Sequence, residues 1–217
     1  MARKDRMGNR KTREQRSNRK VPEMGYYLVV TDTKATERCF FEGLHNSLPE
    51  NMRKKLVIKV IETKTKDLIG KCLEMTAYDA QYRIPWIVFD RDKVTNFDNI
   101  ITDAERVGIH VGWSNPCFEI WMFSYFGSMP AIQDSWVCCS KFGDLYQKMT
   151  GQEYSKSDAS MYKRLCEKGD EEKALSLAEK KFQQCLREGK TIPSNMCPAT
   201  RVHELVGEIK GKVMKNM

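Results

Sequence analysis

Short apolar runs alternate with amphipathic segments through the first half of this 217-residue chain. The runs are continuously apolar, which is typical of strands that are buried on both faces of a sheet. Strands are expected at 26–31, 56–61, 84–89 and 109–113, and helices between them at 35–47, 65–82 and 96–107. This alternation predicts an α/β fold with a mostly parallel sheet flanked by helices.

The pattern changes after Trp113, where every later segment is typical of helix. An aromatic helix is expected to start at Asn115 as its N-cap, with Pro116 in the first helical position. A long charged helix ending near Gly189 and a last helix over 200–215 follow. We therefore expect three parts: a basic arm (1–22), an α/β core (25–113), and a helical region (114–217) that packs on the core.

The positive charge of the chain is concentrated at its N-terminus. The whole chain carries a net charge of +8, and residues 1–20 hold nine basic side chains against Asp5 and Glu14. With no apolar periodicity, this arm is expected to be disordered alone. It either contacts phosphate backbones or serves as a solubilising tail. On a later helix, Tyr162 and Lys163 either contact a nucleotide or belong to a solvated face. The candidate contacts to nucleic acid are Arg10, Lys11, Arg13, Arg16 and Lys163.

The eight cysteines are scattered, with no Cys-x-x-Cys motif and no Cys/His grouping at the spacing of a zinc site. We expect reduced thiols that pack as small apolar groups in a cytoplasmic protein. The sequence contains no apolar stretch of the length of a signal peptide or membrane span, so no membrane association is expected.

Acidic side chains follow two of the expected strands. Asp90 and Asp92 end the strand 84–89, and residues i and i+2 of a strand point the same way. An isolated Asp-x-Asp also suits a turn. Carboxyl ends of parallel strands share one sheet edge, however, and carboxylates that converge there repel one another without a cation. Oxygen-only ligands indicate Mg²⁺ or Mn²⁺. The acidic set comprises Asp32, Glu37, Asp90 and Asp92, with Glu119 as a fifth candidate.

In this order the acidic residues resemble Toprim domains of topoisomerases, primases and related nucleases. The chain is more similar to the RloB proteins of bacterial defence and restriction loci. That resemblance spans nearly the whole chain, including the basic arm. It rests on Thr36-Glu37 with Cys39-Phe40-Phe41, on Val88-Phe89-Asp90-Arg91-Asp92, on Asn115-Pro116-Cys117-Phe118-Glu119-Ile120-Trp121, and on the segment 198–206.

The resemblance implies a Toprim-like fold and a Mg²⁺- or Mn²⁺-dependent endonuclease, a phosphodiesterase that acts on RNA, with tRNA as one candidate, in antiphage defence. It implies that Asp90 and Asp92 bind metal and that Glu37 belongs to the same centre. Where the family pattern has Glu-Gly, this chain has Asp32-Thr33. Asp32, shorter by one methylene, would complete the metal shell or orient water.

Several alternatives stay open at this stage. His203, in a segment that the resemblance returns to the site, is either catalytic or a structural helix residue. Arg91 is expected to form a structural ion pair. The chain can also be a non-catalytic nucleic-acid or nucleotide-binding module that lost its chemistry through Asp32-Thr33. It can equally be a nuclease subunit that needs a partner protein or a signal, and a homo-oligomer is also left open.

Overall fold

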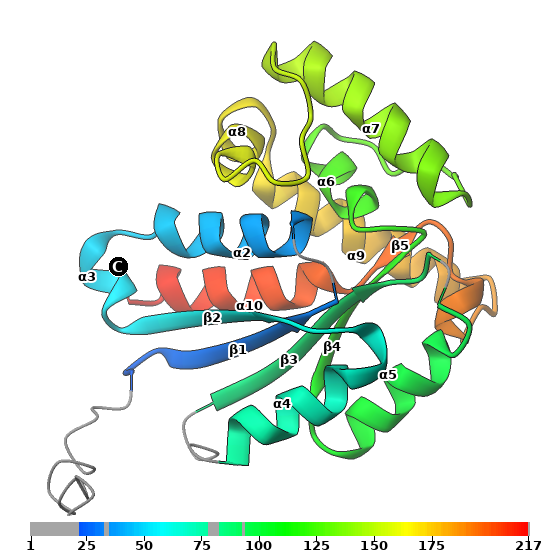
Figure 1. Ribbon diagram of the computed structural model, residues 1–217. Coiled ribbons are helices and arrows are strands. Elements are labelled where there is room, and N and C mark those ends of the chain that lie inside the picture. Colours follow the sequence, from blue (N-terminus) through cyan, green and yellow to red (C-terminus); the bar gives the residue numbers. More distant parts are fainter. Residues whose placement is uncertain (1–21, 33–34, 78–82, 93, 217) are drawn as a thin grey trace, which may run out of the picture.

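A five-stranded sheet forms the centre of the computed structural model, which describes residues 22–32, 35–77, 83–92 and 94–216 (Figure 1). The strand order is β2-β1-β3-β4-β5. The strands are β1 (Gly25–Thr31), β2 (Leu56–Glu62), β3 (Arg83–Asp90), β4 (His110–Asn115) and β5 (Ala199–Thr200). All neighbouring strands are parallel except β4 and β5, which are antiparallel. The expected α/β class and mostly parallel sheet are confirmed.

Helices cover both faces of the sheet. Alternate residues of β1 show why: Tyr27 and Val29 pack in one apolar cluster, and Leu28 and Val30 pack in the other. The first face is covered by α2 (Thr36–Ser47) and α10 (Val202–Met214), and the second by α4 (Leu68–Ala77) and α5 (Phe97–Arg106). The remaining helical elements are α3 (Glu50–Arg53), η1 (Thr65–Asp67), α6 (Glu119–Tyr125), α7 (Ser135–Thr150), α8 (Met161–Lys168), α9 (Glu171–Arg187) and η3 (Pro193–Asn195).

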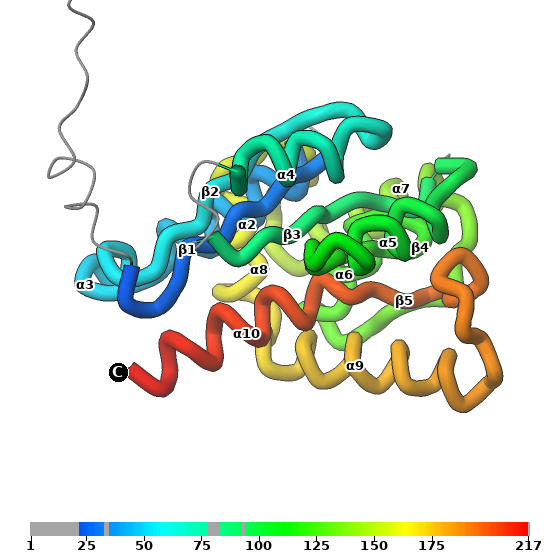
Figure 2. The backbone as a smooth tube through the Cα atoms, turned by 90° about the horizontal axis from the view of Figure 1, so that it is seen from below, coloured from blue at the N-terminus to red at the C-terminus, as the bar shows by residue number. Residues whose placement is uncertain are grey.

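The C-terminal part of the chain helps to build the sheet layer. Strand β5 extends the sheet beyond β4, and α10 then runs beside α9 (Figure 2). The hydroxyl of Tyr27 in β1 donates a hydrogen bond to Glu208 Oε1 in α10, at 2.6 Å. One apolar cluster contains residues that precede residue 113 in the sequence together with residues that follow it. The expected helical region therefore contributes one short strand as well as helices, and it shares a core with the strands that precede it.

The expected N-cap at Asn115 is wrong. Asn115 is the last residue of β4, and its side-chain amide donates to the carbonyl oxygens of Pro193 and Ser194. The Asn115-Pro116 peptide bond is cis, and α6 begins only at Glu119. The amide thus fastens the end of β4 to η3 instead of capping a helix.

The structure tests only in part the expected nucleic-acid contacts of the basic arm and the expected lack of membrane association. Arg10, Lys11, Arg13 and Arg16 of the basic arm lie outside the described residues. In the part of the chain that is described, no helix is both long enough and apolar enough to cross a membrane.

Candidate metal centre

A cleft of about 620 Å³ opens at the carboxyl edge of the sheet. Strands β1 and β3 are parallel neighbours, so the residues that follow them emerge at the same edge. Asp32 comes directly after β1, Asp90 ends β3, and Asp92 lies two residues further. The cleft is lined by Asp32, Thr65, Asp90, Asp92, Val94, Cys117, Ser135, Trp136, Cys139 and Lys156. The structure thus brings the three aspartates of the acidic set to one cleft.

Asp32 is held by a threonine that sequence reasoning missed. Its Oδ2 accepts a hydrogen bond from Thr65 Oγ1 at 3.1 Å, whereas Oδ1 is buried and has no hydrogen-bond partner among the described residues. Burial raises the pKa of Asp32 to about 6, against the hydrogen bonds from Thr65 and from its own backbone N–H. The charge of Asp92 also raises this pKa. A buried carboxylate oxygen that faces a cleft without a donor is available for a cation.

Glu37 and Asp90 are the most deeply buried acids of the cluster. Glu37, the second residue of α2, is 1% exposed, and burial together with the charge of Asp32 raises its pKa to about 8. Burial, then the charges of Glu37 and Glu119, raise the pKa of Asp90 well above its usual range. The backbone N–H of Phe118 opposes that rise. Without a cation, burial and the neighbouring negative charges therefore favour the protonated form of both carboxyl groups.

Glu119, the first residue of α6, lies close enough for its charge to act on Glu37 and Asp90, and its own pKa is lowered. It is 1% exposed, and its Oε1 accepts from the Tyr154 hydroxyl at 2.8 Å and pairs with Lys156 Nζ at 3.3 Å. Although burial acts to raise it, the pKa of Glu119 is lowered by Lys156, by the Cys117 thiol and by Tyr154. Tyr154 and Lys156 come from the connection between α7 and α8, and nothing in the local sequence indicates that Lys156 lines the cleft.

The histidine proposed from the sequence lies elsewhere. His203, near the start of α10, is buried and its Nε2 lies 2.8 Å from Glu179 Oε2 on α9. Its ring also packs near that of Phe182. His203 is not among the residues that line the cleft. Its contacts are those of a residue that holds α10 against α9.

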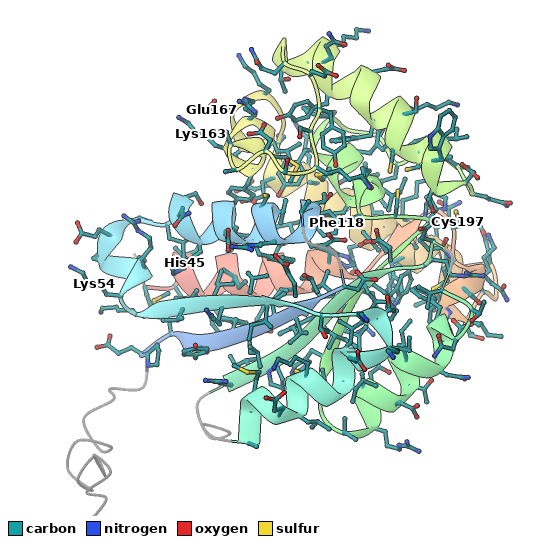
Figure 3. The ribbon with its side chains drawn as sticks, in the orientation of Figure 1. His45, Lys54, Phe118, Lys163, Glu167 and Cys197 are labelled. Carbon is teal, nitrogen blue, oxygen red and sulfur yellow. The ribbon has the colours of Figure 1, made fainter. Side chains whose placement is uncertain are left out.

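The expected nucleic-acid contacts on α8 are also distant from the cleft. Tyr162 is buried and donates to Glu171 Oε1, so its ring is not available to a base. Lys163 is 75% exposed and pairs with Glu167. Figure 3 shows Lys163 and Glu167 well away from Phe118, whose backbone contacts Asp90.

Arg91, which the sequence predicted to form an ion pair, instead donates to the carbonyl oxygens of Asp92 and Val94. Its guanidinium also lies 5.9 Å from the centre of the Phe97 ring. Arg91 thereby fixes the turn that carries Asp92.

The acidic cluster fits a hydrated divalent cation. The Oδ1 atoms of Asp32 and Asp90 are both buried and without a hydrogen-bond donor among the described residues. Within that part of the chain, no three carboxylate oxygens of the cluster lie within 4.8 Å of one another. Mg²⁺ commonly keeps several water ligands and uses one or two carboxylates, so this looser arrangement suits it. Asp32 and Asp90 are the residues that would hold the ion.

Among comparisons with known proteins, one family model matches this chain. The family model described as RloB-like protein matches residues 27–209. No curated protein and no solved structure matches the chain. The match includes most of β1, the other strands, the carboxylates of the cleft and most of α10. Because it covers most of the sequence, the chain belongs to the RloB-like family.

Proposed function

We propose that this protein is a Mg²⁺- or Mn²⁺-dependent endonuclease of the Toprim type. The observation that carries the proposal is the pair of buried carboxylate oxygens, on Asp32 and Asp90, that face one cleft without hydrogen-bond donors. A bound divalent cation would activate water and neutralise charge on the scissile phosphate. Glu37, with a raised pKa, can hold or accept a proton beside Asp90. Lys156 provides a positive charge at the cleft for a phosphate.

We infer that the substrate is RNA, with tRNA as the first candidate, and that the activity serves antiphage defence. The resemblance to defence nucleases supports this substrate. The basic arm, with nine basic and two acidic side chains in residues 1–20, supports binding to a polyphosphate. His203 has no role in this proposal, because it contacts α9.

A non-catalytic nucleotide-binding module is the second candidate. Asp32 replaces the longer glutamate of the family pattern, and Thr33 replaces its glycine. Among the described residues, no three carboxylate oxygens of the acidic cluster lie within 4.8 Å of one another, which is consistent with this alternative. Such a module would bind RNA and Mn²⁺ without breaking a phosphodiester bond.

Cleavage assays separate the two candidates. Purified protein is incubated with a tRNA pool and, separately, with plasmid DNA, in Mg²⁺, in Mn²⁺ and in EDTA. The nuclease gives discrete RNA fragments that require the metal, and DNA is cut less or not at all. Retarded but intact RNA in every metal supports the binding module. Repeating the assay with extract from phage-infected cells tests for an activating partner or signal.

Trp136 is expected to stack on an unpaired base. Its side chain is 78% exposed at the start of α7 and lines the cleft, whereas the other tryptophans, Trp86, Trp113 and Trp121, are buried. Trp136→Ala should weaken binding of single-stranded RNA in EDTA about 10-fold, the scale of one base-aromatic contact. Trp136→Phe should retain most of the affinity.

Fluorescence anisotropy of labelled single-stranded RNA measures the affinity of each variant. In the wild type, quenching of the one exposed tryptophan reports stacking on Trp136 itself. Met149→Ala removes another exposed apolar side chain from the same helix and should leave the affinity unchanged. Equal quenching by RNA and by an abasic oligonucleotide would rule out stacking on Trp136.

A further inference from the structure

Two cysteines and a glutamate meet in the wall of the cleft. One ligand atom each from Cys117, Glu119 and Cys139 lie within 4.8 Å of one another. Glu119 is the first residue of α6, Cys117 lies two residues before it, and Cys139 lies on α7, so the group links α7 to the start of α6. The positions are too far apart in the sequence, and too irregularly spaced, to resemble a zinc motif. Only the fold reveals them.

The separation of the sulfur atoms suits a metal. Cys117 Sγ and Cys139 Sγ are 3.8 Å apart. A tetrahedral Zn²⁺ with bonds of about 2.3 Å to sulfur holds two thiolate sulfurs about 3.8 Å apart. A disulfide would require the sulfurs to approach to about 2.05 Å. The separation of the two Sγ atoms therefore matches that of two thiolates on one zinc ion, without movement of either backbone segment.

The thiols are poorly suited to oxidation. Hydrogen bonding to neighbouring thiols and burial raise the pKa values of Cys117 and Cys139. Because the thiolate is the species that reacts with peroxide, both thiols are expected to react slowly. A metal, in contrast, displaces the thiol protons as it binds.

The charges around the three ligands balance. Two thiolates and one carboxylate carry one more negative charge than Zn²⁺ neutralises. Lys156 supplies the missing positive charge, because its Nζ lies 3.3 Å from Glu119 Oε1 and its charge also acts on Cys139. The Tyr154 hydroxyl and Lys156 both contact Oε1, so neither occupies Oε2. The carboxylate also accepts a hydrogen bond from the Cys117 thiol, and a metal that binds here would displace that proton.

We propose that Cys117, Glu119 and Cys139 form a Zn²⁺ site in the wall of the cleft, distinct from the oxygen-ligand site of Asp32 and Asp90. Sulfur ligands select zinc over magnesium, so the two sites differ in chemistry. Both cysteines line the cleft, which gives the ion a path of entry and leaves a fourth coordination position for water. Binding releases the two thiol protons to solvent. The proposal does not depend on nuclease activity.

Cobalt spectroscopy tests the site in the full chain. Metal-free, reduced protein is titrated with Co²⁺, which should give thiolate-to-cobalt charge-transfer absorption and tetrahedral d–d absorption that saturate at one equivalent. One equivalent of Zn²⁺ should then remove both signals. Absence of the charge-transfer absorption from folded wild-type protein would overturn the proposal, whatever the variants do.

Matched variants locate the site. Cys139→Ser is expected to weaken Zn²⁺ binding at least about 100-fold, beyond the effect typical of a residue outside the ligand shell. Cys166→Ser, which changes an exposed cysteine on α8, should bind Zn²⁺ as the wild type does. Asp90→Asn should keep the charge-transfer absorption, because Asp90 belongs to the acidic cluster. An unchanged signal in Cys139→Ser would refute the assignment, and circular dichroism confirms that each variant is folded.

Discussion

Asp90→Asn is expected to abolish metal-dependent RNA cleavage and, at the same time, to stabilise the metal-free protein. The carboxylate would be lost as a ligand, so cleavage should fall on the order of 10³-fold, the scale of losing an electrostatic contact to the transition state. Mn²⁺ binding, followed by electron paramagnetic resonance, should weaken in parallel. This second measurement keeps the prediction testable if the isolated chain needs a partner to cleave.

The gain in stability has a separate physical cause. Asp90 is buried beside Glu37 and Glu119, and folding at neutral pH must either protonate it or bury its charge. Asparagine removes that cost. The free energy of unfolding in EDTA at pH 8 should therefore rise, and the melting temperature should rise with it. A gain in stability with a loss of activity is typical of functional sites.

Asp103→Asn is the matched control. Asp103 lies on the exposed side of α5, where it pairs with Arg106. Its replacement should change stability by no more than about 0.5 kcal/mol and leave cleavage and Mn²⁺ binding intact. If Asp90→Asn cleaves RNA at the wild-type rate, the proposed metal centre is in the wrong place.

The metal-free protein is expected to lose stability as the pH rises from about 5 to 8. Burial raises the pKa of Asp32 to about 6 and that of Glu37 to about 8, whereas in the unfolded chain both titrate near 4. Over this window the folded state binds more protons than the unfolded state, so raising the pH favours unfolding. The loss should be on the order of 3 kcal/mol, or about 6–12 °C in melting temperature.

Saturating Mn²⁺ should reverse much of this loss, because the cation replaces the protons on the carboxylates. Thermal unfolding at several pH values, with EDTA and with Mn²⁺, measures both curves. Glu37→Gln should flatten the EDTA curve, since glutamine does not titrate. A metal-free protein that is equally stable at pH 5 and pH 8 would contradict the pKa assignments.

Much of the fold could be predicted from the sequence, because its strands are continuous apolar runs. The strand expected at 56–61 is observed as β2, and the helix expected at 96–107 is observed as α5. Asn115 misled the prediction because its side chain caps no helix and instead contacts Pro193 and Ser194, far along the chain. The residue type was informative, but its partner depended on the tertiary fold.

The residues of the candidate site likewise include some that could be predicted from the sequence and some that could not. Asp90 and Asp92 could be found because they lie at the end of a strand, and Asp32 because its strand is a parallel neighbour. Thr65 and Lys156 could not, because distant segments bring them to the cleft. The cysteine pair was missed for the same reason, since the packing of α7 on α6 creates it. Spacing along a sequence reveals ligands only when one local element carries them.

The contact between Tyr27 and Glu208 has a consequence for how the chain folds during translation. These residues are 181 positions apart, and the apolar face of β1 that includes Val29 packs in the same cluster as Val206 and Ile209 of α10. On the ribosome, the first strand therefore emerges long before the helix that covers it. A nascent chain therefore leaves this apolar face uncovered until α10 has emerged, and such exposed apolar surface is what chaperones bind.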